Sequence, residues 1–353
     1  MDGIVVLEDG RYFLGRRFGS APKSQGEVVF NTSHTGYQEI LTDPSYAGQI
    51  VVLTYPHIGN YGVNANDAES GRVAAAGLLV RDYHPVPSNW RSDQSLDSWM
   101  SSTGTAGLCG VDTRALVLHI RRHGALRGLI RALPEQCSNI PIAGYVSIAN
   151  GVPDDPNLPL VDAPEISALA LEAARNESMA GLDLASRVTC KEPSTHGPED
   201  ASLHVVAMDF GIKLNIVRQL VQSGARVTVV PATTPSADIL AMKPDGVLLS
   251  NGPGDPEPVE YAVETIRELL GTVPIFGICL GHQLLGIACG GRTYKLPFGH
   301  RGSNHPVRDL YTGRIEITAQ NHGFAVDATS LDGRHVAITH LHLNDDTAAG
   351  FQH

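Results

Sequence analysis

Cysteine is scarce in this chain of 353 residues, and its five cysteines are scattered along it. Their number is odd and no two of them form a C-x-x-C pair, so the pattern predicts neither a disulfide framework nor a cysteine zinc site. A reducing compartment is the better expectation. Positive charge is also in short supply, since the net charge is −11 and the pI is about 5.7. We therefore expect no nucleic-acid partner.

Long apolar runs are missing as well. The opening M-D-G-I-V-V-L-E-D-G has neither a basic start nor a long apolar core, so we expect no signal peptide. No apolar run approaches the length of a membrane span, and we expect a cytoplasmic protein with no membrane partner. The G-x-x-x-x-G-K-[ST] phosphate loop is absent too, so no nucleotide site is expected in this chain.

The length and the ordinary apolar fraction of 42% predict two domains. Residues 1–150 carry many short strand signals and form a predicted mixed α+β domain. Residues 151–202 are richer in proline and polar residues and form a predicted connecting region. The expected strands are Ile4–Leu7, Glu27–Asn31, Gln49–Thr54 and Gly77–Arg81, the expected helices are Asp112–His123 and Ile166–Arg175, and Ser194–Ala201 is expected to be a loop.

Residues 203–353 form the predicted second domain. Strands alternate there with helices at a spacing typical of an α/β fold with a mostly parallel sheet. The expected strands are His204–Asp209, Arg226–Val230, Asp245–Ser250 and Ile275–Ile278, and the expected helices are Ile212–Ser223, Ser236–Met242, Glu260–Leu270 and His282–Ala288. After Gly290 the alternation stops, and shorter strands are expected over Thr293–Leu296, Arg314–Ala319 and His335–Thr339.

The stretch Pro274–Gln283 reads P-I-F-G-I-C-L-G-H-Q and places a cysteine where an apolar strand meets a helix. Gly277 and Gly281 stand two residues to either side of Cys279, which is the spacing of a nucleophile elbow. Glycine is expected there because a side chain would collide with neighbouring backbone. The following helix N-terminus favours a thiolate, and the Leu280 N–H is placed to hold an oxyanion. A buried core cysteine is the alternative that these residues leave open.

A second glycine-bearing turn, S-N-G-P-G-D-P over Ser250–Pro256, follows the preceding strand. Gly252 and Gly254 let the backbone approach a ligand and present free N–H groups, although a plain tight turn is the alternative. Ligands of parallel sheets sit beyond the carboxyl ends of the strands, so this turn and Cys279 are expected at one edge. Lys213, after another predicted strand, either lines this edge or merely flanks a helix.

The motifs L-S-N-G-P-G-D-P, F-G-I-C-L-G-H-Q-L-L and A-Q-N-H-G-F occur in this order. In combination they resemble the class I glutamine amidotransferases. More narrowly, the chain resembles the small-subunit family of the carbamoyl-phosphate synthetases, from its first predicted strand to its last residue. The stretches that carry this resemblance are G-E-V-V-F-N-T-S-H-T-G-Y-Q-E-I-L-T-D-P-S-Y (26–46), T-Y-P-H-I-G-N (54–60), S-N-W-R (88–91), G-V-D-T-R-A-L (110–116), D-F-G-I-K-L-N-I (209–216) and F-G-H-R-G-S-N-H-P (298–306).

The resemblance implies a C-terminal class I glutamine amidotransferase domain with a mostly parallel sheet, preceded by a mixed α+β domain. It implies that Cys279 attacks the carboxamide of glutamine, forms a γ-glutamyl thioester and releases ammonia. The oxyanion would be held by the Leu280 N–H and the backbone of the Gly252–Gly254 loop. The residues expected to bind glutamine are Ser45, Gly252, Gly254, Leu280, Gln283, Asn321, Gly323 and Phe324.

The resemblance also implies a partner. The ammonia would pass to a large subunit, in a heterodimer or a higher oligomer, which uses bicarbonate and ATP to make carbamoyl phosphate for arginine and pyrimidine synthesis. No cofactor and no metal are expected in this chain, and ATP and Mg are expected on the large subunit.

One part of the family pattern is missing. The family's base is the histidine of a late H-P-E segment whose glutamate orients it, and this sequence contains no H-P-E. Gln352-His353 does not match the segment, because the family spacing places one residue between Gln and His and a Pro-Glu after them. We interpret His322, His340 and His342 as structural or surface residues. We therefore expect a chain that stops short of that segment, binds glutamine poorly and hydrolyses it very slowly.

Two alternatives remain open at this point. One is a non-catalytic partner that keeps the fold and the large-subunit interface; the elbow at Cys279 argues against it and the missing base argues for it. The other is a class I amidotransferase for nucleotide or anthranilate synthesis, against which the stretch Gly26–Tyr46 argues.

Overall fold

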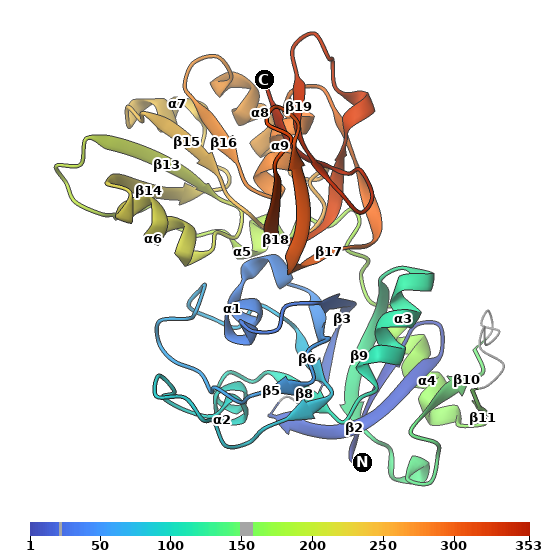
Figure 1. Cartoon of the computed structure of the whole chain (residues 1–353). Helices are drawn as coiled ribbons and strands as arrows, with labels where there is room; N and C mark the ends of the chain where they lie inside the picture. The colour runs from blue at the N-terminus through green and yellow to red at the C-terminus, as the bar shows by residue number, and fades with distance from the viewer. Residues whose placement is uncertain (21–22, 149–157) are drawn as a thin grey trace. The chain divides into compact units, whose positions relative to one another are not determined.

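The structure of the chain is a computed structural model that describes residues 1–20, 23–148 and 158–353 (Figure 1). The described residues divide into two compact units. The first comprises Met1–Thr42 and Gly48–Ser178, and the second comprises Asp43–Ala47 and Met179–His353. The domain boundary predicted at residue 150 lies outside the described residues. The five-residue segment Asp43–Ala47 thus belongs to the second unit although its neighbours in sequence belong to the first.

The first unit is built around a sheet whose pairing closes on itself. Within the described residues the strand order is β1-β9-β3-β4-β6-β8-β2, and β1 pairs with β2 as well as with β9. Strands β10 and β11 extend from β2, while β5 and β7 pair with each other. The strands are β1 (Gly3–Leu7), β2 (Arg11–Gly19), β3 (Lys23–Asn31), β4 (Gln49–Leu53), β5 (His57–Ile58), β6 (Gly77–Val80), β7 (Asp82–Tyr83), β8 (Ala106–Cys109), β9 (Leu126–Ala132), β10 (Ala143–Val146) and β11 (Leu160–Val161).

Helices accompany this sheet in the first unit. They are α1 (Tyr37–Thr42), α2 (Leu96–Ser102), α3 (Thr113–His123), the 3₁₀ turn η2 (Glu135–Cys137) and α4 (Pro164–Ala174). Helix α3 begins where its cap predicted, since the Asp112 carboxylate accepts a hydrogen bond from the Ala115 N–H at 3.0 Å. Helix α4 packs Ile166 and Ala170 against Ile4 of β1. The mixed α+β prediction for this part of the chain is confirmed.

The second unit contains the predicted α/β layer. In the part of the chain that the structure describes, its sheet has the order β12-β14-β13-β15-β16, and the last four of these strands run parallel. The strands are β12 (Ser194–His196), β13 (Leu203–Asp209), β14 (Ala225–Pro231), β15 (Gly246–Leu249) and β16 (Ile275–Gly277). The helices are α5 (Ala185–Val188), α6 (Leu214–Gln222), α7 (Ser236–Ala241), α8 (Glu260–Leu269) and α9 (Leu280–Ala288), and η1 (Pro44–Tyr46) is a 3₁₀ turn.

Helices cover both faces of this parallel sheet. Met208 of β13 packs in a core cluster with Ile266 of α8 and Leu284 of α9, whereas its neighbour Ala207 packs with Val217 of α6. Successive side chains of a strand point to opposite faces, so β13, β14 and β15 each contribute apolar residues to two cores. This explains the near-continuous apolar runs from which the parallel sheet was predicted.

The loop predicted over Ser194–Ala201 is wrong for its first three residues. They form β12, which pairs antiparallel with β14 in the register Ser194 to Val229 and His196 to Val227. All three side chains are exposed, so the strand carries no apolar signal. An edge strand is held by backbone hydrogen bonds, and these leave little trace in the sequence.

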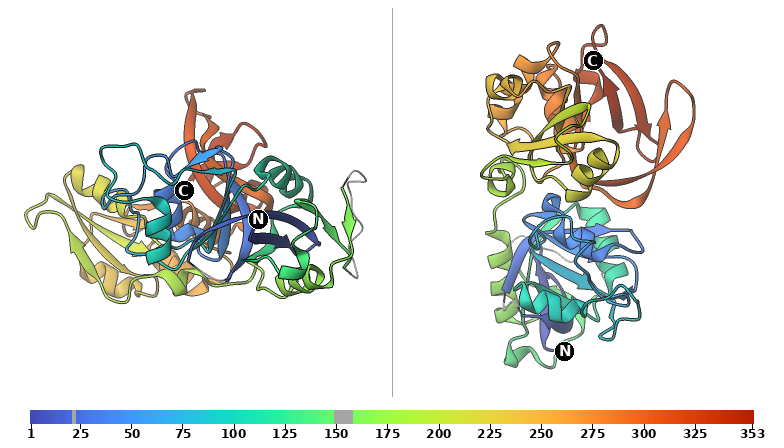
Figure 2. Two further views of the ribbon diagram at one scale, coloured as in Figure 1. Left: turned by 90° about the horizontal axis from the view of Figure 1, so that it is seen from below. Right: turned by 90° about the vertical axis from the view of Figure 1, so that its left-hand side faces the viewer.

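A second sheet of the unit, β18-β17-β19-β20, follows α9 (Figure 2). Its strands are β17 (Arg292–Asp309), β18 (Ile315–Asp327), β19 (Ala337–His342) and β20 (Ala348–Gln352), and η3 (Ala328–Ser330) follows β18. The prediction of shorter strands is wrong, because β17 has 18 residues and β18 has 13. Register shifts at Lys295/His300 and Gly302/His305 interrupt the alternation along β17 and hid its length.

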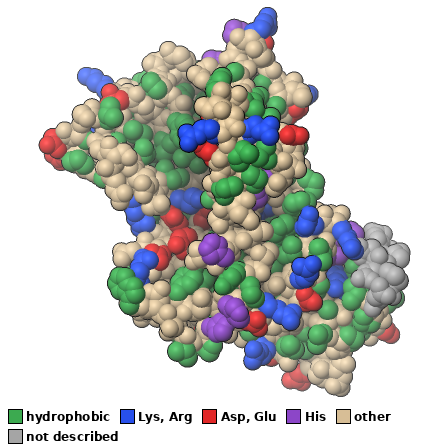
Figure 3. Space-filling view, in the orientation of Figure 1, with side chains coloured by type: hydrophobic (Ala, Val, Ile, Leu, Met, Phe, Trp, Pro, Cys, Tyr) green, Lys and Arg blue, Asp and Glu red, His purple; other side chains and the backbone are tan. Residues whose placement is uncertain are grey.

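Charged side chains are distributed over the surface. Figure 3 shows Lys and Arg side chains, in small groups, interspersed with Asp and Glu side chains on the face that it presents. Among the described residues, none of the helices is both long enough and apolar enough to cross a membrane.

Candidate active site

Cys279 stands at a sharp turn between β16 and α9. Its backbone has φ 53° and ψ −106°, a strained conformation that costs of order 1–3 kcal/mol. A Cβ built on Gly281 would lie 2.2 Å from the carbonyl oxygen of Leu249, and one built on Gly277 would lie 2.7 Å from the carbonyl oxygen of Gly281. Glycine is therefore required at both positions, as predicted. Helix α9 starts at Leu280, two residues earlier than expected.

The Cys279 thiol is half-buried and donates from Sγ to the carbonyl oxygen of Asn321 at 3.3 Å. Burial is the largest influence on this group and raises the pKa of the Cys279 thiol to about 11, with the Asp43 carboxylate acting in the same direction. The Lys213 ammonium and the peptide N–H groups of Leu280 and Gly252 act to lower this pKa. The helix N-terminus acts in the predicted direction through the Leu280 N–H, but desolvation outweighs it, so the pKa of the thiol is raised.

The glycine loop after β15 is held by buried polar side chains. The Ser250 hydroxyl accepts from the Phe210 N–H at 2.9 Å and donates to the carbonyl oxygen of Asn251 at 2.7 Å. A Cβ on Gly252 would lie 2.3 Å from the carbonyl oxygen of Phe210. Gly254 has φ 87°, which favours glycine at this position. Buried hydrogen bonds therefore hold the loop in this conformation.

The segment Asp43–Ala47 brings a second set of polar groups to the same place. The Asp43 carboxylate accepts from the Ser45 N–H at 2.9 Å and so caps η1. The Ser45 hydroxyl accepts from Nδ2 of Asn251 at 2.9 Å. On its other side, Asp43 forms an ion pair with the Lys213 ammonium at 3.7 Å and accepts from Nδ2 of Asn321 at 3.4 Å. Ser45 and Asn321, far apart in sequence, are thereby brought together.

Strand β18 lies across the Cys279 thiol from helix α9. Gln283 of α9 is 4% exposed and donates from Nε2 to the carbonyl oxygen of Phe324 at 2.7 Å. Gln283 and Cys279, one helical turn apart, thus both bond to main-chain carbonyls of β18. Gly323 lies against the buried Arg301, whose Nη2 would be 3.1 Å from a Cβ at this position. Helix α9 and strand β18 are therefore locked together around the thiol.

These groups surround a cavity of about 500 Å³. Of the residues predicted from the sequence, Cys279, Ser45, Gln283, Asn321 and Phe324 line it. Leu280 and Gly252 lie beside the thiol, on which their N–H groups act. Gly254 and Gly323 pack instead against Leu184 and Arg301. A cavity of this size suits a small polar molecule.

Asp43, Asn251 and Lys213 also line the cavity. Sequence reasoning gave no role to the first two and left the third undecided. The available signal was the position of two polar side chains: Asp43 lies two residues before Ser45, and Asn251 directly precedes Gly252. Their burial, 4% and 2% exposed for Asp43 and Asn251, is what marks them as part of the site.

Several histidines lie near the cavity, and their hydrogen bonds lead away from the thiol. His322 bonds through Nδ1 to the Phe324 carbonyl oxygen and through Nε2 to Oε1 of Gln320. Burial lowers the pKa of His322 to about 3 and that of His282 to about 4, so both rings are neutral at pH 7. Among the described residues no histidine is hydrogen-bonded to Sγ of Cys279.

Residues 5–130 match the family described as "Carbamoyl-phosphate synthase small chain, CPSase domain", and residues 206–353 match "Glutamine amidotransferase class-I". The carbamoyl phosphate synthase small chain of Syntrophotalea carbinolica is 52% identical over 366 residues, which cover 100% of this chain and 89% of the relative. The chain belongs to the carbamoyl phosphate synthase small chain family.

Other members of this family are similarly close. The carbamoyl phosphate synthase small chain of Chlorobaculum tepidum is 51% identical, over 99% of this chain and 88% of the relative. The chloroplastic small chain of Oryza sativa subsp. japonica is 46% identical, over 100% of this chain and 75% of the relative. Family membership identifies residues 206–353 as a class I glutamine amidotransferase domain. It also sets aside the alternative of an amidotransferase for nucleotide or anthranilate synthesis.

Proposed function

We propose that this chain is a glutaminase subunit in which Cys279 is the nucleophile. The observation that carries the proposal is the strained elbow that presents the thiol to a cavity lined by polar groups of three segments. The thiol gives its proton to a base, and the sulfur bonds to the carboxamide carbon of glutamine. The base passes this proton to the amide nitrogen, the C–N bond breaks and ammonia leaves, and water then hydrolyses the γ-glutamyl thioester to glutamate.

The oxyanion of this reaction needs fixed donors. The peptide N–H groups of Leu280 and Gly252 already act on the sulfur of Cys279, and both belong to rigid segments. We assign the oxyanion hole to these two groups. Donors that are already in place in this way reduce the reorganisation that the reaction needs.

The cavity also offers groups for the two charged ends of glutamine. The Asp43 carboxylate can pair with an α-ammonium, and the Lys213 ammonium can pair with an α-carboxylate. Ser45, Gln283 and Asn321 supply neutral polar groups. The complete set of proposed glutamine-binding residues is Asp43, Ser45, Lys213, Gly252, Gly254, Leu280, Gln283, Asn321, Gly323 and Phe324.

We further propose that the ammonia passes to a large subunit, which holds the ATP and Mg sites. The relatives are named as small chains of a carbamoyl phosphate synthase, which supports a larger partner. A pull-down with a large synthetase subunit tests this step. Failure of the two chains to associate, with the large subunit correctly folded, contradicts it.

A second candidate is a non-catalytic small chain that keeps the fold. Two observations favour it: the pKa of Cys279 is raised to about 11, and no described histidine bonds to the thiol. Both predict that the chain by itself hydrolyses glutamine very slowly. Near-normal turnover of the isolated chain contradicts this and would show that a histidine of the chain serves as base.

Labelling with a chloroketone analogue of glutamine separates the two candidates. A glutaminase lineage predicts alkylation of Cys279 that glutamine suppresses, even where turnover is slow. Cys279→Ser removes the labelling, whereas Cys289→Ser is the matched control, since Cys289 is also half-buried and caps the other end of α9. Labelling that glutamine does not suppress favours the non-catalytic chain.

A further inference from the structure

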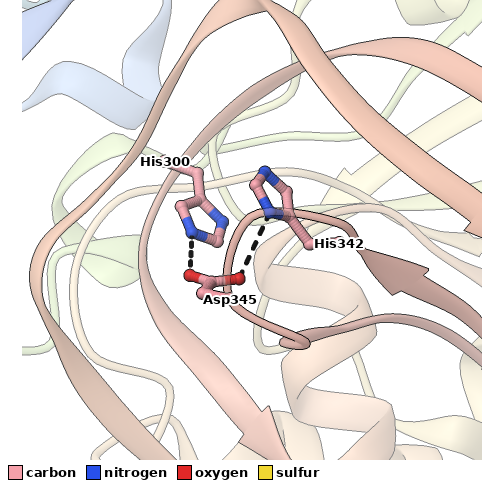
Figure 4. Close-up of side chains that lie close together, drawn as sticks. All are labelled: His300, His342 and Asp345. Carbon is pink, nitrogen blue, oxygen red and sulfur yellow. Dashed lines mark hydrogen bonds and ion pairs between the residues drawn. The ribbon is translucent and has the colours of Figure 1, made fainter.

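Beside the cavity that holds Cys279, a histidine cluster gathers around one carboxylate (Figure 4). His300 of β17 bonds through Nε2 to Oδ2 of Asp345 at 2.6 Å, and His342 at the end of β19 contacts Oδ1 through Nδ1 at 3.2 Å. The two imidazole rings stack at 4.1 Å with an angle of 12°. Each ring therefore directs one nitrogen to its own oxygen of the Asp345 carboxylate.

We propose that His300, His342 and Asp345 form a binding site for a divalent transition metal ion of the zinc class. One donor atom from each residue can be chosen so that all lie within 4.8 Å of one another. Tetrahedral zinc with donors about 2.0–2.1 Å away separates them by roughly 3.3 Å. To reach this geometry, the 2.6 Å contact between His300 and Asp345 must lengthen and the two stacked rings must turn toward a common point.

The donor set selects the metal class. Imidazole suits zinc, copper and nickel, whereas magnesium and calcium prefer oxygen ligands. Two imidazoles and one carboxylate leave a fourth position for water, as in zinc sites with three protein ligands. The negative charge of the Asp345 carboxylate would offset part of the positive charge of the metal ion.

The surroundings resemble the outer shell of a metal site. His305 contacts Nε2 of His342 through Nδ1 at 3.0 Å, so the nitrogen of His342 that is remote from Asp345 is held in place. Metal-bound histidines usually have such a partner on the second nitrogen. In addition, Nδ1 of His300 and Nε2 of His305 are buried without a hydrogen-bond partner among the described atoms. The His300 nitrogen that faces Asp345 is Nε2, so its remote nitrogen Nδ1, unlike that of His342, has no such partner among the described atoms.

An ion can reach the cluster from two sides. His300 and His342 are 7% and 1% exposed but line the same cavity as Cys279, and the Asp345 side chain is 40% exposed. Sequence reasoning looked for a metal site in cysteine spacing and expected none. The sequence did not predict the cluster, because its three residues come from two separate strands and a turn.

Metal binding can be measured on the full chain without reference to glutamine hydrolysis. The chain is stripped with a chelator and titrated with Zn²⁺ by calorimetry, in a Cys279→Ser background that removes the nearby thiol. We expect one equivalent to bind, and His342→Gln and Asp345→Asn to weaken binding at least about tenfold. His335→Gln, at an exposed histidine outside the cluster, is the matched control and is expected to bind as tightly as the parent.

Co²⁺ provides a second readout that does not depend on the variants folding. A tetrahedral site of nitrogen and oxygen donors gives intense visible bands in the parent and in His335→Gln. Binding that is equally tight in Asp345→Asn overturns the proposal, as does the absence of stoichiometric Zn²⁺ binding. A Co²⁺ spectrum with only the weak bands of a hydrated surface ion overturns it as well.

Discussion

Asn251 donates from Nδ2 to the hydroxyl oxygen of Ser45 at 2.9 Å, across 206 residues of sequence. The same nitrogen donates to the carbonyl oxygen of Gly211 at 2.9 Å, and Oδ1 accepts from the Lys213 N–H at 3.1 Å. Water cannot replace these partners, since Asn251 is 2% exposed. One amide therefore ties together three segments that border the cavity.

Substitution of Asn251 tests this role. Asn251→Asp replaces the donating nitrogen by a carboxylate oxygen that faces the Gly211 carbonyl and, at 3.4 Å, Oδ1 of Asp43. We expect a loss of about 3 kcal/mol or more in the free energy of unfolding, because a buried charge is left against other acceptors. Urea denaturation measures it. Asn66→Asp, at an exposed asparagine, is the control and is expected to change stability by less than about 0.5 kcal/mol.

The elbow glycines make a second prediction. Gly281→Ala brings a methyl group to 2.2 Å from the carbonyl oxygen of Leu249, so strand β15 and helix α9 must separate. We expect a loss of at least about 2–3 kcal/mol in unfolding free energy. Gly333→Ala is the matched control, because nothing lies within 4 Å of its added methyl group. Equal stability of the two variants would falsify the close contact.

The acidity of Cys279 makes a third prediction. Since burial raises the pKa of the thiol to about 11, the thiolate is the minor form at neutral pH. The rate of alkylation by iodoacetamide should then rise about tenfold per pH unit from pH 7 to pH 10, without a plateau at the ordinary cysteine value of about 8.5. Peptide mass spectrometry follows the modification of Cys279 alone.

The charges of Asp43 and Lys213 predict opposite changes in the rate of Cys279 alkylation. Asp43→Asn removes a group that raises the pKa of Cys279, so alkylation at a given pH should be faster. Lys213→Met removes a group that lowers this pKa, so alkylation should be slower. Shifts in the same direction for both variants would show that altered exposure, and not charge, controls the thiol.

Gln283 makes a fourth prediction. Gln283→Glu keeps the shape of the side chain but replaces the Nε2 donor to the Phe324 carbonyl oxygen by an acceptor. We expect a loss of about 2–3 kcal/mol in unfolding free energy, because the residue is 4% exposed. The same exchange at the exposed Gln222, at the end of α6, should be nearly neutral. A stable Gln283→Glu protein would indicate that α9 and β18 are held by other contacts.

Local sequence patterns were enough to predict the α/β layer. The strands β13 to β16 are rich in apolar residues and are separated by helices, two of which are followed by a glycine with positive φ, Gly224 after α6 and Gly271 after α8. The elbow was predictable for the same reason, since its requirements lie within the five residues from Gly277 to Gly281. Periodicity and steric demand are properties of short segments, and a single sequence displays them directly.

Other features of the site could not be read in this way. The net direction of the Cys279 pKa depends on burial, and burial is a property of the assembled unit. The partners of Asp43 lie at Lys213 and Asn321, so neither spacing nor periodicity reports them. The length of β17 was hidden by its irregular register with β18. Each of these features depends on contacts between segments that are distant in sequence.

Because Asp43–Ala47 belongs to the second unit, it also affects when that unit can fold during synthesis. The contacts of this segment with Asn251 and Asn321 span 206 and 278 residues. At about 5–20 residues per second, a ribosome needs roughly 10–40 s to pass from Ser45 to Asn251. During that interval the Asn251 amide that donates a hydrogen bond to the Ser45 hydroxyl has not yet been made. Contacts that close so long a loop also form late in folding. The cavity is therefore completed only after most of the chain has been made.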